Sequence, residues 1–250
     1  VFFVAAMLYK NTSLKQIMLT SALAGVHVLM LVVEKDLGAA VIFFVTYIVM
    51  LYVATRRAMW PLMGLAAGAG ASVVAYHLFD HVKRRVVAWK DPWGNYNDAG
   101  YQIAQSLFAI GTGGWFGMGL YQGMPKDIPV RESDFIFAVI AEELGGFFAI
   151  CLILVFMSCF IMFINISLRL TNTFYKLLAI GLSIAYGFQL FLCIGGVIKF
   201  IPHTGVTLPL ISYGGSSILS TIIVFAVIQG LYLLKQKEVK EIEEKRRESE

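Results

Sequence analysis

Three carboxylates lie beside or within a long apolar stretch, and they are the first residues of this chain that could do chemistry. Asp134 opens the stretch, and Glu142 and Glu143 follow about two turns later. If one helix carries all three, Glu142 lies about 12 Å along its axis from Asp134. Carboxylates in such surroundings are costly, so they are candidates for exchanging protons with a substrate. The structural alternative is that Ser133 or Asp134 only caps the helix.

Glycines and hydroxyls form a second group, just before another apolar stretch, within residues 202–217. A helix start offers backbone N–H groups and the positive end of the helix dipole, so it can bind an anion. The alternative is a tightly packed helix start, in which the glycines allow close contact between helices. The candidate residues are Ser212, Tyr213, Gly214, Gly215 and Ser216.

The third group is basic and could bind phosphate. Lys83, Arg84 and Arg85 are consecutive, and Lys199 lies in a later polar segment. Arginine can donate two parallel hydrogen bonds to phosphate oxygens, so a lipid head group with a diphosphate is a natural ligand. The alternative is that these side chains anchor the chain to ordinary lipid phosphates.

The elements that must position these residues belong in a membrane. Of the 250 residues, 58% are hydrophobic and 14% are charged, and the mean hydropathy is +0.75. An average soluble domain is about 45–50% apolar and about 25% charged, so a water-soluble globular protein is excluded. The net charge of +4 is too small and too dispersed for a nucleic-acid surface. The three cysteines lie in apolar stretches without metal-site or disulfide spacing.

Long uncharged stretches predict membrane-spanning helices, because a span must satisfy its own backbone hydrogen bonds. The chain is therefore predicted to be an all-α, polytopic membrane bundle with about seven membrane helices. Six are full spans, at 17–33, 38–55, 58–79, about 135–168, 177–198 and 212–234, and residues 1–9 are a partial span. Because the chain opens in mid-span, we expect a fragment that lacks upstream spans. The predicted membrane domain covers 1–234, and a charged cytoplasmic tail covers 235–250.

Basic residues in short loops mark the cytoplasmic side. All ten acidic residues before the tail then fall on or near the outer face. The loop over 80–133 is the largest outer segment, and its aromatic residues argue against disorder. Its apolar stretch 103–110 predicts a short amphipathic helix along the membrane surface. The cytoplasmic loops are those that hold Lys10 and Lys15, Arg56 and Arg57, and Arg169 and Lys176.

Short blocks of sequence along nearly the whole chain are typical of one family. The blocks are Glu-Lys-Asp-Leu-Gly at 34–38, Arg-Val at 85–86, Asp-Pro at 91–92, Gly-Tyr-Gln-Ile-Ala-Gln-Ser at 100–106, Gly-Thr-Gly-Gly at 111–114, Ser-Asp-Phe-Ile-Phe at 133–137, Glu-Glu-Leu-Gly at 142–145 and Leu-Pro-Leu-Ile-Ser-Tyr-Gly-Gly-Ser-Ser at 208–217. In this order they resemble the blocks of the shape, elongation, division and sporulation family, exemplified by FtsW, RodA and SpoVE. The family has ten membrane helices, so the resemblance implies that this chain holds the carboxyl-terminal seven.

The resemblance implies a peptidoglycan glycosyltransferase of the bacterial cytoplasmic membrane, which polymerises lipid II at the outer face during cell division or elongation. In the family, the Asp of the Asp-Phe-Ile-Phe block is catalytic, and that residue is Asp134 here; Glu142 and Glu143 would support it. The implied partners are lipid II, undecaprenyl diphosphate-linked glycan, a class B penicillin-binding protein transpeptidase and other divisome or elongasome membrane proteins.

Two positions depart from the family pattern. Family members commonly have Pro-Glu-x-His-Thr before the Asp-Phe pair, whereas residues 129–133 read Pro-Val-Arg-Glu-Ser here. The resemblance therefore supplies no histidine beside Asp134. A usual proline in the earlier outer block is Lys35.

The mechanistic hypothesis is an inverting transfer, in which Asp134 takes the proton of the acceptor 4-hydroxyl as a general base. The diphosphate then leaves, stabilised by Lys83, Arg84, Arg85 or Lys199, and a divalent cation such as Mg²⁺ or Mn²⁺ could assist. No organic cofactor is expected. Two alternatives stay open: a lipid II flippase, and a non-catalytic membrane scaffold of the cell-wall synthesis complex.

Overall fold

The computed structural model describes residues 1–98, 100–124 and 127–249, and every regular element within them is a helix. The all-α prediction is confirmed for this part of the chain. In chain order the helices are α1 (Phe2–Leu8), α2 (Leu14–Val33), α3 (Leu37–Thr55), α4 (Met59–Leu78), α5 (Asp80–Lys90), α6 (Tyr101–Gly113), α7 (Ile136–Arg169), α8 (Thr173–Val197) and α9 (Gly215–Ser249).

Six of these helices are long and apolar enough to cross a membrane: α2, α3, α4, α7, α8 and α9. They coincide with the six predicted full spans, and α1 is the predicted partial span. Hydropathy located them well because a span must close its backbone hydrogen bonds within one long apolar segment. The predicted tail contains no separate element, because α9 continues through it to Ser249.

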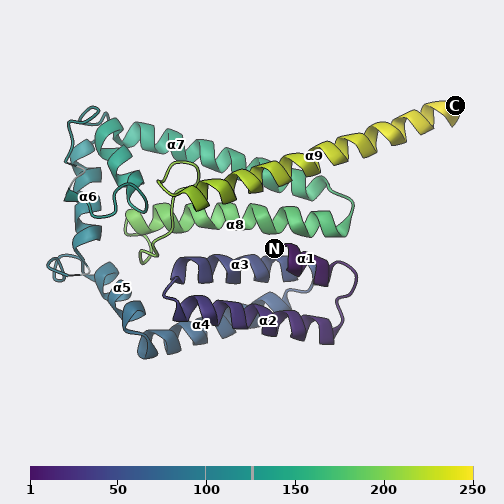
Figure 1. Ribbon diagram of the computed structural model, residues 1–250, viewed down its shortest axis with the longest axis horizontal. Helices are drawn as coiled ribbons and strands as arrows, with labels where there is room; N and C mark the ends of the chain where they lie inside the picture. The colour runs from purple at the N-terminus through teal and green to yellow at the C-terminus, as the bar shows by residue number, and fades with distance from the viewer. Residues whose placement is uncertain (99, 125–126, 250) are drawn as a thin grey trace.

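Helix α8 forms the centre of the bundle. It lies between α7 and α3, and α2 and α4 lie beyond α3 (Figure 1). Its buried residues come from every side of the helix, including Leu177, Ala179 and Tyr186. At Gly181 a Cβ atom would lie 2.7 Å from the Sδ atom of Met50, so the missing side chain permits α3 to approach α8 closely. By contrast, α4 has no buried residue.

The predicted outer loop holds two helices at one end of the bundle (Figure 1). Phe79 is extended, with φ −116° and ψ 112°, and it separates α4 from α5. Helix α6 contains the predicted amphipathic stretch and runs across the ends of α7 and α8. Its buried face includes Ile103 and Ser106, and the Ser106 hydroxyl donates a hydrogen bond to the Val197 carbonyl at 3.1 Å. The apolar face of α6 is therefore used for packing within the protein.

Helix α7 is broken at Gly145, which has φ 87° and ψ 167°. The break corrects the prediction of one uninterrupted span over about 135–168, because it divides α7 into a short first segment and a longer second one. Asp134 lies in a turn before the helix, and Glu142 lies in a short segment that ends at the break. A Cβ atom at Gly145 would lie 2.4 Å from the Gly117 backbone nitrogen, so glycine allows both the positive φ and the close approach of the loop.

Candidate active site

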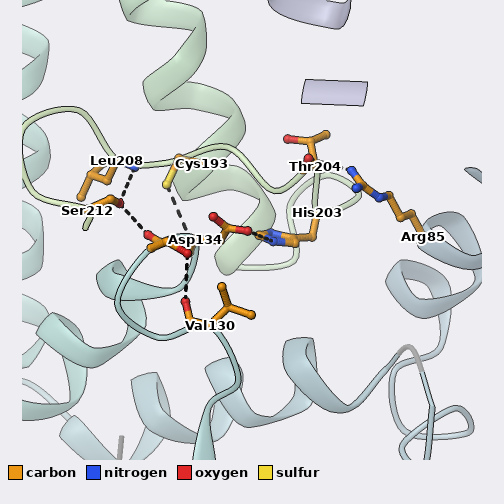
Figure 2. A network of polar contacts seen from close by, with 9 residues as sticks. Arg85, Val130, Asp134, Cys193, His203, Thr204, Leu208 and Ser212 are labelled. Carbon is orange, nitrogen blue, oxygen red and sulfur yellow. Dashed lines mark hydrogen bonds and ion pairs between the residues drawn. The ribbon is translucent and has the colours of Figure 1, made fainter. Parts of the chain in front are cut away.

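Asp134 is held by its backbone in the turn before α7. The preceding carbonyl, of Ser133, accepts a hydrogen bond from the Ser212 hydroxyl, and the Asp134 carbonyl accepts a contact from the Cys193 thiol at 4.0 Å (Figure 2). Phe135, the next residue, is fully buried. Two other segments, the loop with Ser212 and helix α8 with Cys193, therefore hold this short turn, while the Asp134 side chain itself stays 22% exposed.

Helix capping does not explain Asp134. Phe135 occupies the N-cap position of α7, and no side chain caps that helix end. The Ser133 hydroxyl instead contacts the Val130 carbonyl at 3.4 Å. Because the capping alternative fails for both residues, the charge of Asp134 needs another explanation.

The Asp134 carboxylate points toward His203 (Figure 2). The Nε2 atom of His203 lies 3.9 Å from Oδ2 of Asp134, and the imidazole ring stacks on Phe135 with a centroid distance of 4.4 Å and an angle of 26°. The histidine comes from the loop between α8 and α9. This histidine is not predicted from the motif around Asp134, because the residues just before Asp134 include none. The sequence signal that could have identified it is that His203 lies in another loop predicted on the same side of the membrane as Asp134.

Arg85 is the basic residue that reaches this site. Its Nη1 atom donates a 2.7 Å hydrogen bond to the Thr204 carbonyl, on the residue after His203. The Cβ position of Gly205 lies 3.4 Å from Oδ2 of Asp134 and 3.9 Å from Nη2 of Arg85, so both side chains border the same glycine. Burial lowers the pKa of the Arg85 guanidinium, and the charges of Asp36 and Asp134 act in the opposite direction.

The other predicted basic residues lie differently. Successive residues of a helix point about 100° apart. Of the three consecutive basic residues of α5, Arg85 therefore turns inward, whereas Lys83 and Arg84 are exposed. Lys199 follows the end of α8 with φ 60°, and its carbonyl accepts a hydrogen bond from the Trp89 indole at 3.1 Å. The backbone of Lys199 thus connects the end of α8 to α5.

The glycine and hydroxyl segment divides into two parts. Ser212 is 1% exposed, and its hydroxyl accepts a 2.7 Å hydrogen bond from the Leu208 backbone while it donates to Ser133. This hydroxyl is fully used in holding the Asp134 turn. Tyr213 is 79% exposed, and its backbone nitrogen donates to the Glu132 carbonyl at 2.7 Å.

The start of α9 follows directly. Gly215 is exposed with open space at its Cβ position, the nearest atom to that of Gly214 is 3.7 Å away in Ser217, and Ser216 is exposed. Neither glycine is required for close helix contact, so the packing alternative fails here. Anion binding by Gly214, Gly215 and Ser216 stays a prediction.

Glu142 anchors the outer loop. It is 4% exposed, and its Oε1 atom accepts hydrogen bonds from the Met124 backbone at 3.1 Å and the Thr112 hydroxyl at 3.4 Å. The backbone of Glu143 accepts a hydrogen bond from Gly119 at 3.0 Å. Both carboxylate residues therefore hold the segment 112–124 against the short first part of α7, away from the polar contacts of Asp134.

The arrangement does not fit a cation held by the protein. Within the described residues, no group of three or more His, Cys, Asp or Glu side chains could hold a metal ion. Asp134 and His203 make only a pair. Assistance by a divalent cation therefore stays a prediction.

Comparison with known families settles the relationship. A family model described as a cell cycle protein, and named for FtsW, RodA and SpoVE, matches residues 1–236. The chain belongs to this family. A multi-pass bacterial membrane protein follows from that membership together with the six spanning helices.

Curated relatives in the FtsW, RodA and SpoVE family are strongly similar over part of their length. The peptidoglycan glycosyltransferase RodA of Mycobacterium tuberculosis is 42% identical over 198 residues, which cover 79% of this chain and 42% of that protein. The probable peptidoglycan glycosyltransferase FtsW of Aliivibrio salmonicida is 40% identical over 196 residues, which cover 76% and 48%. The chain thus spans less than half the length of these two relatives.

A solved structure has the same fold. It is described as "Structural coordination of polymerization and crosslinking by a peptidoglycan synthase complex", and it matches with a TM-score of 0.77 at 24% identity. The match covers 93% of this chain and 66% of that chain. The helical arrangement around α8 is therefore that of a known family architecture.

Proposed function

We propose that this chain carries the catalytic centre of a peptidoglycan glycosyltransferase that polymerises lipid II. One observation carries the proposal: the turn of Asp134 is held by two other segments, Asp134 caps no helix, and its partly exposed carboxylate faces His203 and borders the same glycine as Arg85. The names of the relatives support the reaction class.

Asp134 acts as the general base in this reaction. Its carboxylate takes the proton from the 4-hydroxyl of the acceptor sugar as that oxygen attacks the anomeric carbon of the donor. The new bond joins the acceptor oxygen to the anomeric carbon, and the bond from that carbon to the diphosphate oxygen breaks. The electron pair leaves with undecaprenyl diphosphate, and attack from the opposite face inverts the anomeric configuration.

Arg85 stabilises the leaving diphosphate. Negative charge on the diphosphate grows in the transition state, and a fixed guanidinium beside it lowers the barrier. The hydrogen bond from Arg85 to Thr204 holds one side of the guanidinium, which leaves its other donors for phosphate oxygens. Gly214, Gly215 and Ser216 at the start of α9 are proposed to bind the same anion.

The proposed setting is the outer face of the bacterial cytoplasmic membrane. The distribution of basic and acidic residues supports that orientation, since the loop end with Asp134 carries the acids. A class B penicillin-binding protein is the proposed partner, because the structural neighbour belongs to a complex that couples polymerization to crosslinking.

The decisive experiment compares Asp134→Asn with wild type in a fluorescent lipid II polymerisation assay in detergent. The substitution removes the base and keeps the shape, so the rate should fall about 10²–10⁴-fold. Glu132→Gln is the matched control, because that side chain is 69% exposed and, among the described residues, forms an ion pair only with Arg131 at 3.8 Å. Full polymerisation by folded Asp134→Asn protein would sink the proposal. A flippase needs two compartments, which a detergent assay lacks, so polymerisation in this assay argues against that alternative. A non-catalytic scaffold would keep its role in the Asp134→Asn variant.

A further inference from the structure

We propose that His203 is a positioning residue that fixes which oxygen of Asp134 removes the proton. The inference rests on the proposed general base, and it concerns a residue outside the sequence blocks that identified the family. His203 reaches the site from the loop after α8, and its Nε2 atom faces Oδ2 of Asp134 at 3.9 Å.

The imidazole is held firmly. One face stacks on Phe135, which is fully buried, and the Arg85 hydrogen bond to Thr204 secures the following residue. On the far side, a Cβ atom at Gly196 would lie 3.0 Å from Nδ1, so this glycine makes room for the ring. A residue fixed on all these sides can orient its neighbour at little further entropic cost.

The surroundings also decide the tautomer. The Nδ1 atom of His203 is buried and has no hydrogen-bond partner among the residues that the structure describes. A hydrogen on Nδ1 would be a buried donor without an acceptor, which is costly. The hydrogen of the neutral ring therefore belongs on Nε2, the nitrogen that faces Asp134.

This geometry gives the two carboxylate oxygens of Asp134 different roles. The Nε2–H group of His203 donates to Oδ2, and Oδ1 accepts the proton of the sugar 4-hydroxyl; His203 keeps its own hydrogen throughout. The present 3.9 Å separation is about 1 Å longer than a direct hydrogen bond. Catalytic hydrogen bonds are often long before substrate binds, so we expect this one to shorten when the substrate is bound.

Three variants of the full-length protein test the inference. His203→Gln keeps an N–H donor near the Nε2 position, so the polymerisation rate should stay within about threefold of wild type. His203→Phe keeps the stacking on Phe135 but loses the donor, and His203→Asn ends too short to donate. Both should slow kcat about 10–100-fold, with the KM for lipid II changed less than about twofold, because only the orientation of the base is lost.

The matched control is His27→Phe. His27 is an exposed histidine of α2 that contacts the Leu23 carbonyl of its own helix at 3.1 Å and stacks on Phe43, so the same substitution there should leave kcat unchanged. In an Asp134→Asn background, His203→Phe should cause no further loss, because the histidine acts only through Asp134.

Each result separates the two proposals. The positioning role is overturned if His203→Phe or His203→Asn keeps the wild-type kcat, or if His203→Gln slows kcat as much as they do. If Asp134→Asn is inactive in the same assay, the proposed function still stands. Full activity of Asp134→Asn overturns the proposed function itself. If His203→Phe and His203→Asn raised the KM for lipid II and left kcat unchanged, His203 would contact the substrate, and the inference would also be overturned.

Discussion

The buried hydroxyl of Ser212 donates a hydrogen bond to the carbonyl of Ser133, the residue immediately before Asp134. Ser212 and Ser133 lie 79 positions apart, and their contact connects the loop before α9 to the turn before α7. The Ser212 hydroxyl therefore supports the turn that carries Asp134, the proposed general base.

Ser212→Ala should reduce both stability and activity. It leaves the Leu208 backbone nitrogen and the Ser133 carbonyl without this partner, and an unsatisfied buried group costs about 1–3 kcal/mol. Thermal unfolding in detergent and the polymerisation rate measure the two effects. Ser220→Ala is the control, because that exposed hydroxyl only contacts the Ser216 carbonyl of its own helix. A Ser212→Ala protein as stable as Ser220→Ala would contradict this prediction.

Arg85→Gln should slow polymerisation far more than a change elsewhere on α5. The variant loses the charge that borders Asp134 and that we propose to stabilise the leaving diphosphate, and removing one such electrostatic contact costs about 10²–10³-fold. Arg85→Lys should recover only part of the rate, since lysine cannot bond Thr204 and phosphate in the same fork geometry. Lys90→Gln, at the exposed end of α5, is the comparison. Equal polymerisation rates in Arg85→Gln, Arg85→Lys and Lys90→Gln would show that Arg85 has no role in the reaction.

Glu142→Gln and Glu142→Ala should behave differently. Glutamine keeps an oxygen that can accept from Met124 and Thr112, whereas alanine leaves those donors unpaired and should cost about 1–3 kcal/mol. Hydrogen exchange of residues 112–124 should rise only in the alanine variant. If folded Glu142→Gln protein lost polymerisation completely, Glu142 would have a chemical role and the anchoring explanation would be wrong.

Gly145→Ala should destabilise the outer loop. The φ of 87° alone costs a non-glycine residue about 1–3 kcal/mol. The added Cβ atom would also lie 2.5 Å from the Trp115 carbonyl oxygen, so the loop must shift. Gly111→Ala on α6 is the control, because its Cβ position meets no atom within 4 Å. Unfolding temperatures in detergent should fall for Gly145→Ala and stay level or rise for Gly111→Ala.

The sequence by itself determined the membrane helices and singled out Asp134 as the candidate general base. Span positions follow from hydropathy, because hydrocarbon leaves no other partner for backbone N–H and C=O groups. Asp134 was predicted because an acid beside an apolar stretch is costly and because it lies in a recognisable motif. Both inferences depend on residues that are neighbours along the chain.

Contacts between distant segments decided the rest. Only the packing of α5 shows that Arg85 turns inward while Lys83 and Arg84 stay exposed. His203 lies 69 positions after Asp134, and it reaches the carboxylate because α8 returns the chain to the end of the bundle where α7 began. Spacing along a sequence fixes which residues share a helix face, but the meeting of two loops depends on how whole helices pack, and only the tertiary structure provides that.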